Sequence, residues 1–239
     1  MEPTRESLKI KIFADGADLS GMIEMASKPY IAGLTTNPTL MKKAGVTDYV
    51  KFAKQVLKEI TQKPISFEVF SDEIEEMKIQ GERIASWGDN VYVKIPITNT
   101  KGRSTRQVIE HLVQKGGKVN VTALMTSEQV SQVASSLDPK VPSCVSVFAG
   151  RIADTGRDPI QIMEECLRHL SLNQNSELIW ASPRELLNVF QADHIGCHII
   201  TATNDILKKL DLIGISLEDY SLETVKMFYA DAKQAGYQI

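Results

Sequence analysis

Short apolar runs alternate with longer stretches of helical periodicity along most of the chain. Apolar runs of strand length that are separated by helical segments are typical of a parallel sheet covered by helices. Eight such runs occur, at residues 10–15, 31–35, 65–70, 90–95, 118–122, 144–148, 178–181 and 197–201. Their spacing is about 30 residues, and the fold they suggest usually takes roughly 250 residues. The 239-residue chain is therefore predicted to be an α/β protein with a (β/α)8 TIM barrel.

The segments between the runs predict helices with one apolar face. In residues 47–60, apolar side chains recur every three or four positions, as expected for a helix that packs on a sheet. No low-complexity segment or linker interrupts this pattern, so we expect residues 1–239 to form a single domain. An extra amphipathic helix is expected beyond the eighth strand, at residues 221–235, with an apolar face of Leu222, Val225, Phe228, Tyr229 and Ala232.

The distribution of charge argues against nucleic-acid and membrane partners. The 27 Lys and Arg and the 30 Asp and Glu are spread along the chain and give a formal net charge of -3. Basic residues do not cluster with aromatic residues, as they would on a nucleic-acid surface. The apolar runs are far shorter than the roughly 18 residues that a membrane span needs. Residues 1–13 lack the apolar segment of a signal peptide, so we expect a cytoplasmic protein.

The sequence carries no signature of a cofactor or a metal site. Neither G-x-G-x-x-G nor G-x-x-x-x-G-K-[ST] occurs, so we expect no dinucleotide or nucleoside triphosphate. Cys144, Cys166 and Cys197 are odd in number and widely spaced, which favours buried core residues. His194 and His198 lie near Cys197, but residues 197 and 198 of a strand point to opposite faces. We therefore expect no metal.

Lys94 stands inside an apolar segment, residues 91–96 (VYVKIP). Barrel strands are covered on both faces, so Lys94 should be buried, and a buried ammonium is unfavourable unless it is paired or neutral. Pro96 has no backbone N–H and should end the strand, which places Lys94 near the carboxyl end, where barrel enzymes carry their chemistry. Lys94 could then act as a neutral amine in Schiff-base formation. It could also snorkel from an edge strand or close a structural ion pair.

Polar side chains also occur at the ends of other predicted strands. The carboxyl ends of barrel strands open on one face, so these side chains should converge there. Each of them has an ordinary structural alternative: Asn37 can start a helix, Glu68 can bind a backbone amide, and Asp15 can cap a turn. The polar residues are Asp15, Thr35, Asn37, Glu68, Asn120, Thr122 and Ser146, with Phe148 and Arg151 just beyond.

Five segments of the chain resemble the transaldolase family, including its short bacterial members, in order and spacing. They are residues 14–18 (ADGAD), 33–39 (GLTTNPT), 93–98 (VKIPIT), 120–122 (NVT) and 181–184 (ASPR). The resemblance spans about residues 8–205. It implies a (β/α)8 barrel that acts on sugar-phosphate substrates through a lysine Schiff base and uses no cofactor. Short members of the family form rings through their C-terminal region, so a homo-oligomer is expected.

The resemblance also implies catalytic roles for four residues. Lys94 would form the Schiff base with the substrate ketone, and Asp15 would exchange the proton of a sugar hydroxyl. Glu68 would act through a water in the dehydration step, and Thr122 would lie beside that water.

The same resemblance implies the residues that bind substrate. Asn37 and Asn120 would hold substrate hydroxyls, and Arg184 would belong to the phosphate site, although it could instead be a helix-surface residue. Guanidinium groups bind phosphate well, and the ends of the seventh and eighth strands of such barrels often hold phosphate. The other expected substrate-binding residues are Thr35, Ser146 and Phe148, with Arg151 and Ser182 at the phosphate.

Two positions bear on the type of reaction. Family members that split fructose 6-phosphate carry Gln and Tyr where this chain has Glu68 and Phe148, so the chain resembles the members that transfer groups. Gly16 stands where the family usually has Thr, Pro183 stands where it usually has Phe, and residues 199–202 lack the usual Pro. These departures bear on which sugar is bound and on the shape of the phosphate site, more than on the role of Lys94.

We therefore expect a transaldolase-type transfer of a dihydroxyacetone unit between sugar phosphates, from donors such as sedoheptulose 7-phosphate or fructose 6-phosphate. Two alternatives stay open. The protein could be an aldolase that releases free dihydroxyacetone, or a non-catalytic barrel that binds a sugar phosphate.

Overall fold

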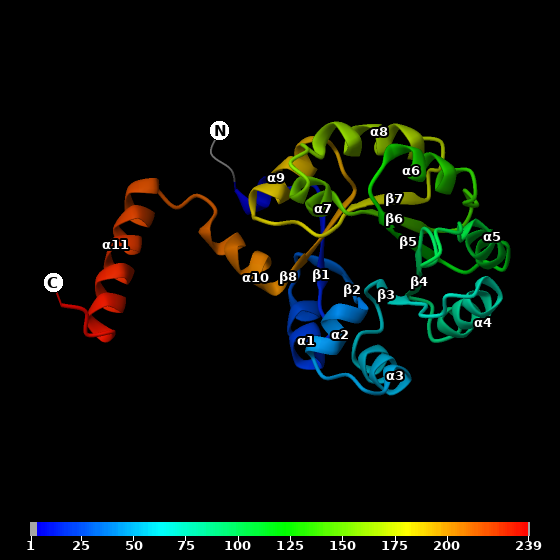
Figure 1. The fold of residues 1–239 in the computed structure, drawn as a ribbon, viewed down its shortest axis with the longest axis horizontal. Coiled ribbons are helices and arrows are strands. Elements are labelled where there is room, and N and C mark those ends of the chain that lie inside the picture. Colours follow the sequence, from blue (N-terminus) through cyan, green and yellow to red (C-terminus); the bar gives the residue numbers. More distant parts are fainter. Residues whose placement is uncertain (1–3, 239) are drawn as a thin grey trace.

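Eight parallel strands close into a barrel in the computed structural model, which describes residues 4–238 (Figure 1). Each strand pairs with the next along the chain, and β8 pairs with β1. The (β/α)8 TIM barrel predicted from the sequence is confirmed. The strands are β1 (Lys11–Asp15), β2 (Ile31–Thr35), β3 (Ile65–Glu68), β4 (Val91–Pro96), β5 (Val119–Leu124), β6 (Ser143–Val147), β7 (Ser176–Trp180) and β8 (Ile199–Thr203).

The predicted strand ends differ from the structure by up to two residues, as at β3, β5, β7 and β8. β3 ends at Glu68 because the amides of the residues at 70 and 71 donate to Oε1 of Gln80, outside the sheet. β8 begins at residue 199 instead of 197. Gly196 has a φ of 75°, and the N–H of Cys197 donates to the carbonyl oxygen of Ala192 at 2.9 Å. Cys197 therefore belongs to the turn that ends the preceding helix.

Helices cover the outside of the barrel (Figure 1). Their inner faces are apolar; in α3, for example, Phe52, Ala53 and Val56 are buried, and Asp48 caps the first turn. The covering helices are α1 (Leu19–Ser27), α3 (Tyr49–Glu59), α4 (Ile74–Ala85), α5 (Arg106–Gln114), α6 (Ser127–Ala134), α8 (Ile160–Leu170) and α9 (Leu187–His194). Shorter helices follow β2, β6 and β8: α2 (Pro38–Lys43), α7 (Ala149–Asp154) and α10 (Asn204–Leu207).

A small apolar cluster fills part of the barrel interior, separate from the large core between strands and helices. It contains Phe13, Cys144 and Ile179 together with Ala181 and Ile199. A Cβ on Gly33 would lie 2.5 Å from the ring of Phe13, so this ring occupies space that only glycine leaves free. The three cysteines are buried, as the sequence predicts.

Helix α11 (Leu217–Gln234) stands away from the barrel (Figure 1). The predicted C-terminal helix is confirmed and begins four residues earlier than expected. Among the residues that the structure describes in α11, none is buried, and Val225, Phe228 and Tyr229 are more than half exposed. Its apolar face therefore does not pack on the barrel of its own chain. Across residues 4–238, no helix is both long enough and apolar enough to pass through a membrane.

Candidate active site

Strand register brings three polar side chains together on β3, β4 and β5. Glu68 is in register with Lys94, and Lys94 is in register with Asn120. Adjacent strands lie about 4.8 Å apart, and side chains in register point to the same face of a sheet. The register alone therefore places a carboxylate beside the Lys94 amine.

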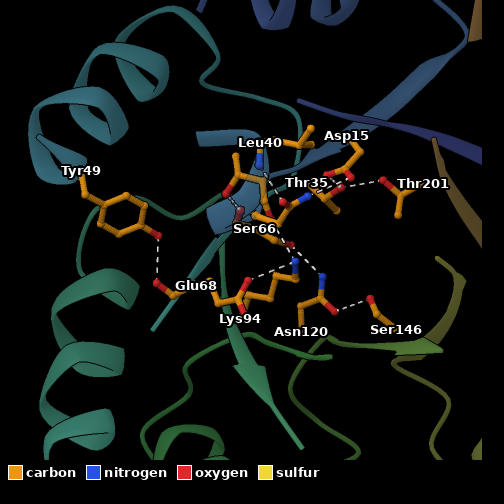
Figure 2. Close-up of polar contacts among 12 residues, drawn as sticks. Asp15, Thr35, Leu40, Tyr49, Ser66, Glu68, Lys94, Asn120, Ser146 and Thr201 are labelled. Carbon is orange, nitrogen blue, oxygen red and sulfur yellow. Dashed lines mark hydrogen bonds and ion pairs between the residues drawn. The ribbon is translucent and has the colours of Figure 1, made fainter. Parts of the chain in front are cut away.

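Lys94 is enclosed and has two oxygen partners (Figure 2). Its Nζ donates to the carbonyl oxygen of Thr36 at 2.9 Å and lies 3.2 Å from Oε2 of Glu68. The side chain of Lys94 is 8% exposed, and that of Glu68 is 16% exposed. The predicted burial is confirmed, as is the end of the strand at Pro96. Snorkelling from an edge is wrong because a closed barrel has no edge strand, whereas the ion pair is present.

Asp15 ends β1 within a chain of hydrogen bonds. Oγ1 of Thr35 donates to one carboxylate oxygen at 2.8 Å, and Nδ2 of Asn37 donates to the other at 3.1 Å. The hydroxyls of Thr35 and Thr201 lie 2.6 Å apart, so Thr201 is the donor of that pair. Burial raises the pKa of Asp15, although the charge of Lys94 and the hydrogen bonds from Thr35 and Asn37 oppose the rise. Asp15 can therefore exchange a proton closer to neutral pH than an exposed carboxyl.

Asn37 serves both functions that the sequence leaves open. Its Oδ1 accepts from the N–H of Leu40 at 2.9 Å and caps α2, whose first residue is Pro38. Its Nδ2 donates to Asp15. The start of α2 thereby fixes an amide against the carboxylate of β1.

Asn120 lies behind the cavity instead of in its wall. Its Nδ2 donates to Oγ of Ser66 at 2.9 Å, and its Oδ1 accepts from Oγ of Ser146 at 2.7 Å (Figure 2). Asn120 is 0% exposed, whereas Ser146 lines the cavity. A bound molecule would meet Ser146 first, and Asn120 fixes the orientation of that hydroxyl.

Arg151, Ser182 and Arg184 come together on the segments that follow β6 and β7. Nη1 of Arg184 donates to Oγ of Ser182 at 3.0 Å, and Nε donates to Oδ1 of Asp154 at 2.9 Å. The guanidinium of Arg151 lies 5.6 Å from the centroid of the Phe148 ring. Two guanidinium groups and a hydroxyl are suited to an anion such as phosphate.

Strained backbone occurs at two positions that line the cavity, one at the irregular end of β5 and one just after β7. Ala123 and Ser182 have φ values of 64° and 59°, which are unfavourable for residues other than glycine. Both residues line the cavity. A Cβ on Gly150 would lie 1.6 Å from the carbonyl oxygen of Ser182, so glycine at this position allows α7 to approach the segment after β7. Such strain is frequent at functional sites.

The cavity at the carboxyl ends of the strands has a volume of about 500 Å³, within the usual range for small-molecule sites. It also contains two threonines that were not expected in the site: Thr201, the last residue of the predicted eighth strand, and Thr203, which lies beyond the predicted end of that strand. Within residues 4–238, the buried hydroxyl of Thr122 has no hydrogen-bond partner. Apart from Asn120, every predicted site residue lines the cavity: Asp15, Thr35, Asn37, Glu68, Lys94, Thr122, Ser146, Phe148, Arg151, Ser182 and Arg184.

No group of three or more His, Cys, Asp or Glu side chains that could hold a metal ion occurs in the described residues. His198 accepts a hydrogen bond at Nδ1 from the N–H of Leu178, 3.0 Å away. This histidine therefore has a structural contact within the barrel wall.

The fold and the cavity define a (β/α)8-barrel protein with a buried lysine and two carboxylates at the carboxyl ends of its strands. The family model described as transaldolase/fructose-6-phosphate aldolase matches residues 12–239. The chain belongs to this family, and the resemblance identified in the sequence is confirmed.

Similar proteins agree with this assignment. The chain is 31% identical over 231 residues to a probable transaldolase of Thermoanaerobacter sp. (strain X514), covering 96% of this chain and 100% of the relative. It is 33% identical to a probable transaldolase of Streptococcus equi subsp. equi (strain 4047), covering 84% and 90%. A putative dihydrodipicolinate synthase family protein from Coccidioides immitis has a TM-score of 0.59 at 11% identity, covering 84% of this chain and 68% of that structure. The last similarity concerns the fold alone.

Proposed function

We propose that this protein is a transaldolase that transfers a dihydroxyacetone unit between sugar phosphates through a Schiff base on Lys94. The observation that carries the proposal is the enclosed Lys94 amine, 3.2 Å from Glu68, in the wall of a cavity that also contains Asp15. A nucleophilic amine and two carboxylates are the groups that Schiff-base cleavage of a ketose requires. Such a reaction would place the protein in the pentose phosphate part of carbohydrate metabolism.

Glu68 is suited to the proton transfers of Schiff-base formation. Nucleophilic attack needs an unprotonated Nζ, so Glu68 would accept the proton of Lys94, directly or through a water. Nζ then bonds to C2 of the ketose, and a proton from Nζ passes to the former carbonyl oxygen, which becomes a hydroxyl. Glu68 would return a proton to this hydroxyl, which leaves as water, and C2 and Nζ form an iminium.

Asp15 is suited to the cleavage step. Its carboxylate would take the proton of the C4 hydroxyl while the C3–C4 bond breaks and the electron pair moves to the iminium. C4 becomes the aldehyde carbon of an aldose phosphate, which leaves, and a three-carbon enamine stays on Lys94. An acceptor aldehyde would then bond to the enamine carbon, and Asp15 would give its proton to the aldehyde oxygen, which becomes the new hydroxyl. Water would add to C2 of the regenerated iminium, and the C2–Nζ bond would break to free the product and the Lys94 amine.

The remaining wall of the cavity would bind the substrate. Thr35 and Asn37 hold Asp15, and Ser146, held by Asn120, faces the cavity. Thr122 has a free hydroxyl within the described residues and would contact the water of the dehydration step. The phosphate would bind beside Phe148, at Arg151, Ser182 and Arg184.

Two other functions compete with transfer. An aldolase would release dihydroxyacetone, but its relatives carry Gln and Tyr in place of Glu68 and Phe148, which favours transfer here. A barrel that only binds sugar phosphate would not need the enclosed pair of Lys94 and Glu68.

A product assay separates these functions. With fructose 6-phosphate and erythrose 4-phosphate, the wild-type protein should form sedoheptulose 7-phosphate faster than it releases dihydroxyacetone from fructose 6-phosphate alone. Lys94→Arg should lower the rate by at least roughly a thousandfold, because arginine stays protonated and offers no nucleophile. Faster release than transfer would identify an aldolase. Binding of fructose 6-phosphate with no product would identify a non-catalytic barrel.

The raised pKa of Asp15 predicts a pH dependence. Asp15 must be a carboxylate to accept the C4 proton, so kcat should fall about tenfold per pH unit below its pKa. Because burial raises this pKa above 3.8, the acid limb should lie above the range of an exposed aspartate. Asp15→Asn should remove most of the activity. Asp18→Asn is the matched control, since Asp18 caps α1 and hydrogen bonds to Ser20 and Gly21 lower its pKa. If kcat instead begins to fall only near pH 4, Asp15 is not the group that accepts the C4 proton.

We also propose that the protein is a cytoplasmic homo-oligomer that α11 helps to assemble. The exposed apolar face of α11, with Val225, Phe228 and Tyr229 at 60%, 63% and 70% exposure, is of the kind that associates with another protein surface. Analytical ultracentrifugation should detect an oligomer, and Phe228→Glu should weaken it. A 26.5 kDa monomer at micromolar concentration would refute this proposal.

A further inference from the structure

Asp154 and Arg184 form a bidentate ion pair at the phosphate end of the cavity, the part where Arg151, Ser182 and Arg184 are proposed to bind phosphate. Nε of Arg184 donates to Oδ1 of Asp154 at 2.9 Å, and Nη2 donates to Oδ2. Nη1 donates to Oγ of Ser182 at 3.0 Å. A guanidinium has five N–H groups, so these contacts leave one on Nη1 and one on Nη2. Because the Ser182 hydroxyl accepts from Arg184, its own hydrogen is also available to a ligand.

The ion pair is too exposed to matter much for folding. The side chains of Arg184 and Asp154 are 45% and 53% exposed, and exposed ion pairs contribute little to stability. Its effect on the conformation of Arg184 is larger, because a free arginine side chain has many rotamers and loses them when it binds a ligand. Because Asp154 already holds the guanidinium, part of this conformational entropy is lost before the ligand binds, and binding costs less.

Asp154 also links the two arginines of the phosphate end. Arg151 and Asp154 are three residues apart on α7, so both lie on one side of that helix. Arg184 follows β7, and Asp154 connects it to α7. The backbones meet at the same place, since Gly150 donates its N–H to the carbonyl oxygen of Ala181 at 3.4 Å.

The charges at this end also agree with a fixed anion site. Arg184 holds the pKa of Asp154 below its usual value, and Arg151 adds to the effect. Asp154 therefore stays ionised, and Arg151, Arg184 and Asp154 together carry one positive charge. The carboxylate of Glu185, next to Arg184 in sequence, forms no ion pair with either arginine in the described residues. A phosphate could therefore still be attracted to the two remaining N–H groups of Arg184, one on Nη1 and one on Nη2.

We propose that Asp154 is a positioning residue that orients Arg184 toward the phosphate of the substrate. The inference rests on the proposed function and adds to it a residue outside the wall of the cavity. Asp154 touches no reacting atom, and it acts through the guanidinium of Arg184.

The test compares Asp154→Asn with Glu185→Gln, which removes one negative charge next to Arg184 without breaking a contact of its guanidinium. kcat and KM are measured for fructose 6-phosphate and for unphosphorylated fructose with the same acceptor. In Asp154→Asn, KM for fructose 6-phosphate should rise roughly three- to tenfold, the effect expected from one released side chain. The preference for fructose 6-phosphate over fructose should fall by the same factor. Glu185→Gln should behave like the wild type, and Asp154→Glu should restore part of the preference.

Four results would overturn the inference. A lower KM in Asp154→Asn would mean that Asp154 competes with the phosphate for Arg184. An equal loss on both substrates would mean a general disturbance of the barrel. If titration with inorganic phosphate followed by 31P NMR shows the same affinity in Asp154→Asn and wild type, Arg184 does not need Asp154. A wild-type protein that binds no phosphate and does not prefer fructose 6-phosphate would refute the phosphate end of the proposed function as well.

Discussion

The burial of the Lys94 amine is the constraint on which the rest of the site depends. An ammonium inside a barrel is costly unless it is paired, and the fold supplies the partners through strand register. β3 places Glu68 beside Lys94, and the turn after β2 places the carbonyl oxygen of Thr36 at 2.9 Å. The same closeness lets Glu68 exchange a proton with the amine in the proposed reaction. One contact therefore makes the buried charge tolerable and would supply the proton acceptor of the proposed reaction.

Closure of the barrel positions Asp15, the second carboxylate of the site. Because β8 pairs with β1, Thr201 can donate to Thr35, which donates to Asp15. Asp15 is thereby held in the cavity wall, where partial burial raises its pKa. The apolar cluster that includes Phe13 fills the interior, so the polar groups gather at the carboxyl ends of the strands. The two carboxylates and the amine share one cavity because the strands all run in the same direction.

Much of this architecture could be predicted from the sequence, for physical reasons. Buried parallel strands are mostly apolar, so all eight were visible, and Lys94 was conspicuous because it stands between Val93 and Ile95 inside such a strand. Local hydrogen bonding was harder to foresee. Cys197 belongs to a helix-ending turn, so β8 starts two residues later than predicted, and the strand continues to Thr203, which lines the cavity. Contacts between distant segments were not predictable. Neither the enclosure of Asn120 behind Ser146 nor the pairing of Asp154 with Arg184, 30 positions apart, leaves a pattern in the sequence.

The most direct test of the account locates the covalent bond that it requires. Borohydride added together with fructose 6-phosphate should reduce the imine, inactivate the protein irreversibly and add the mass of the trapped substrate or its three-carbon fragment. Peptide mass spectrometry should find the added mass on the peptide that contains Lys94, and borohydride without sugar should leave that peptide unlabelled. Label on a different lysine, or no label in a protein that turns over the sugar, would contradict the Schiff-base account.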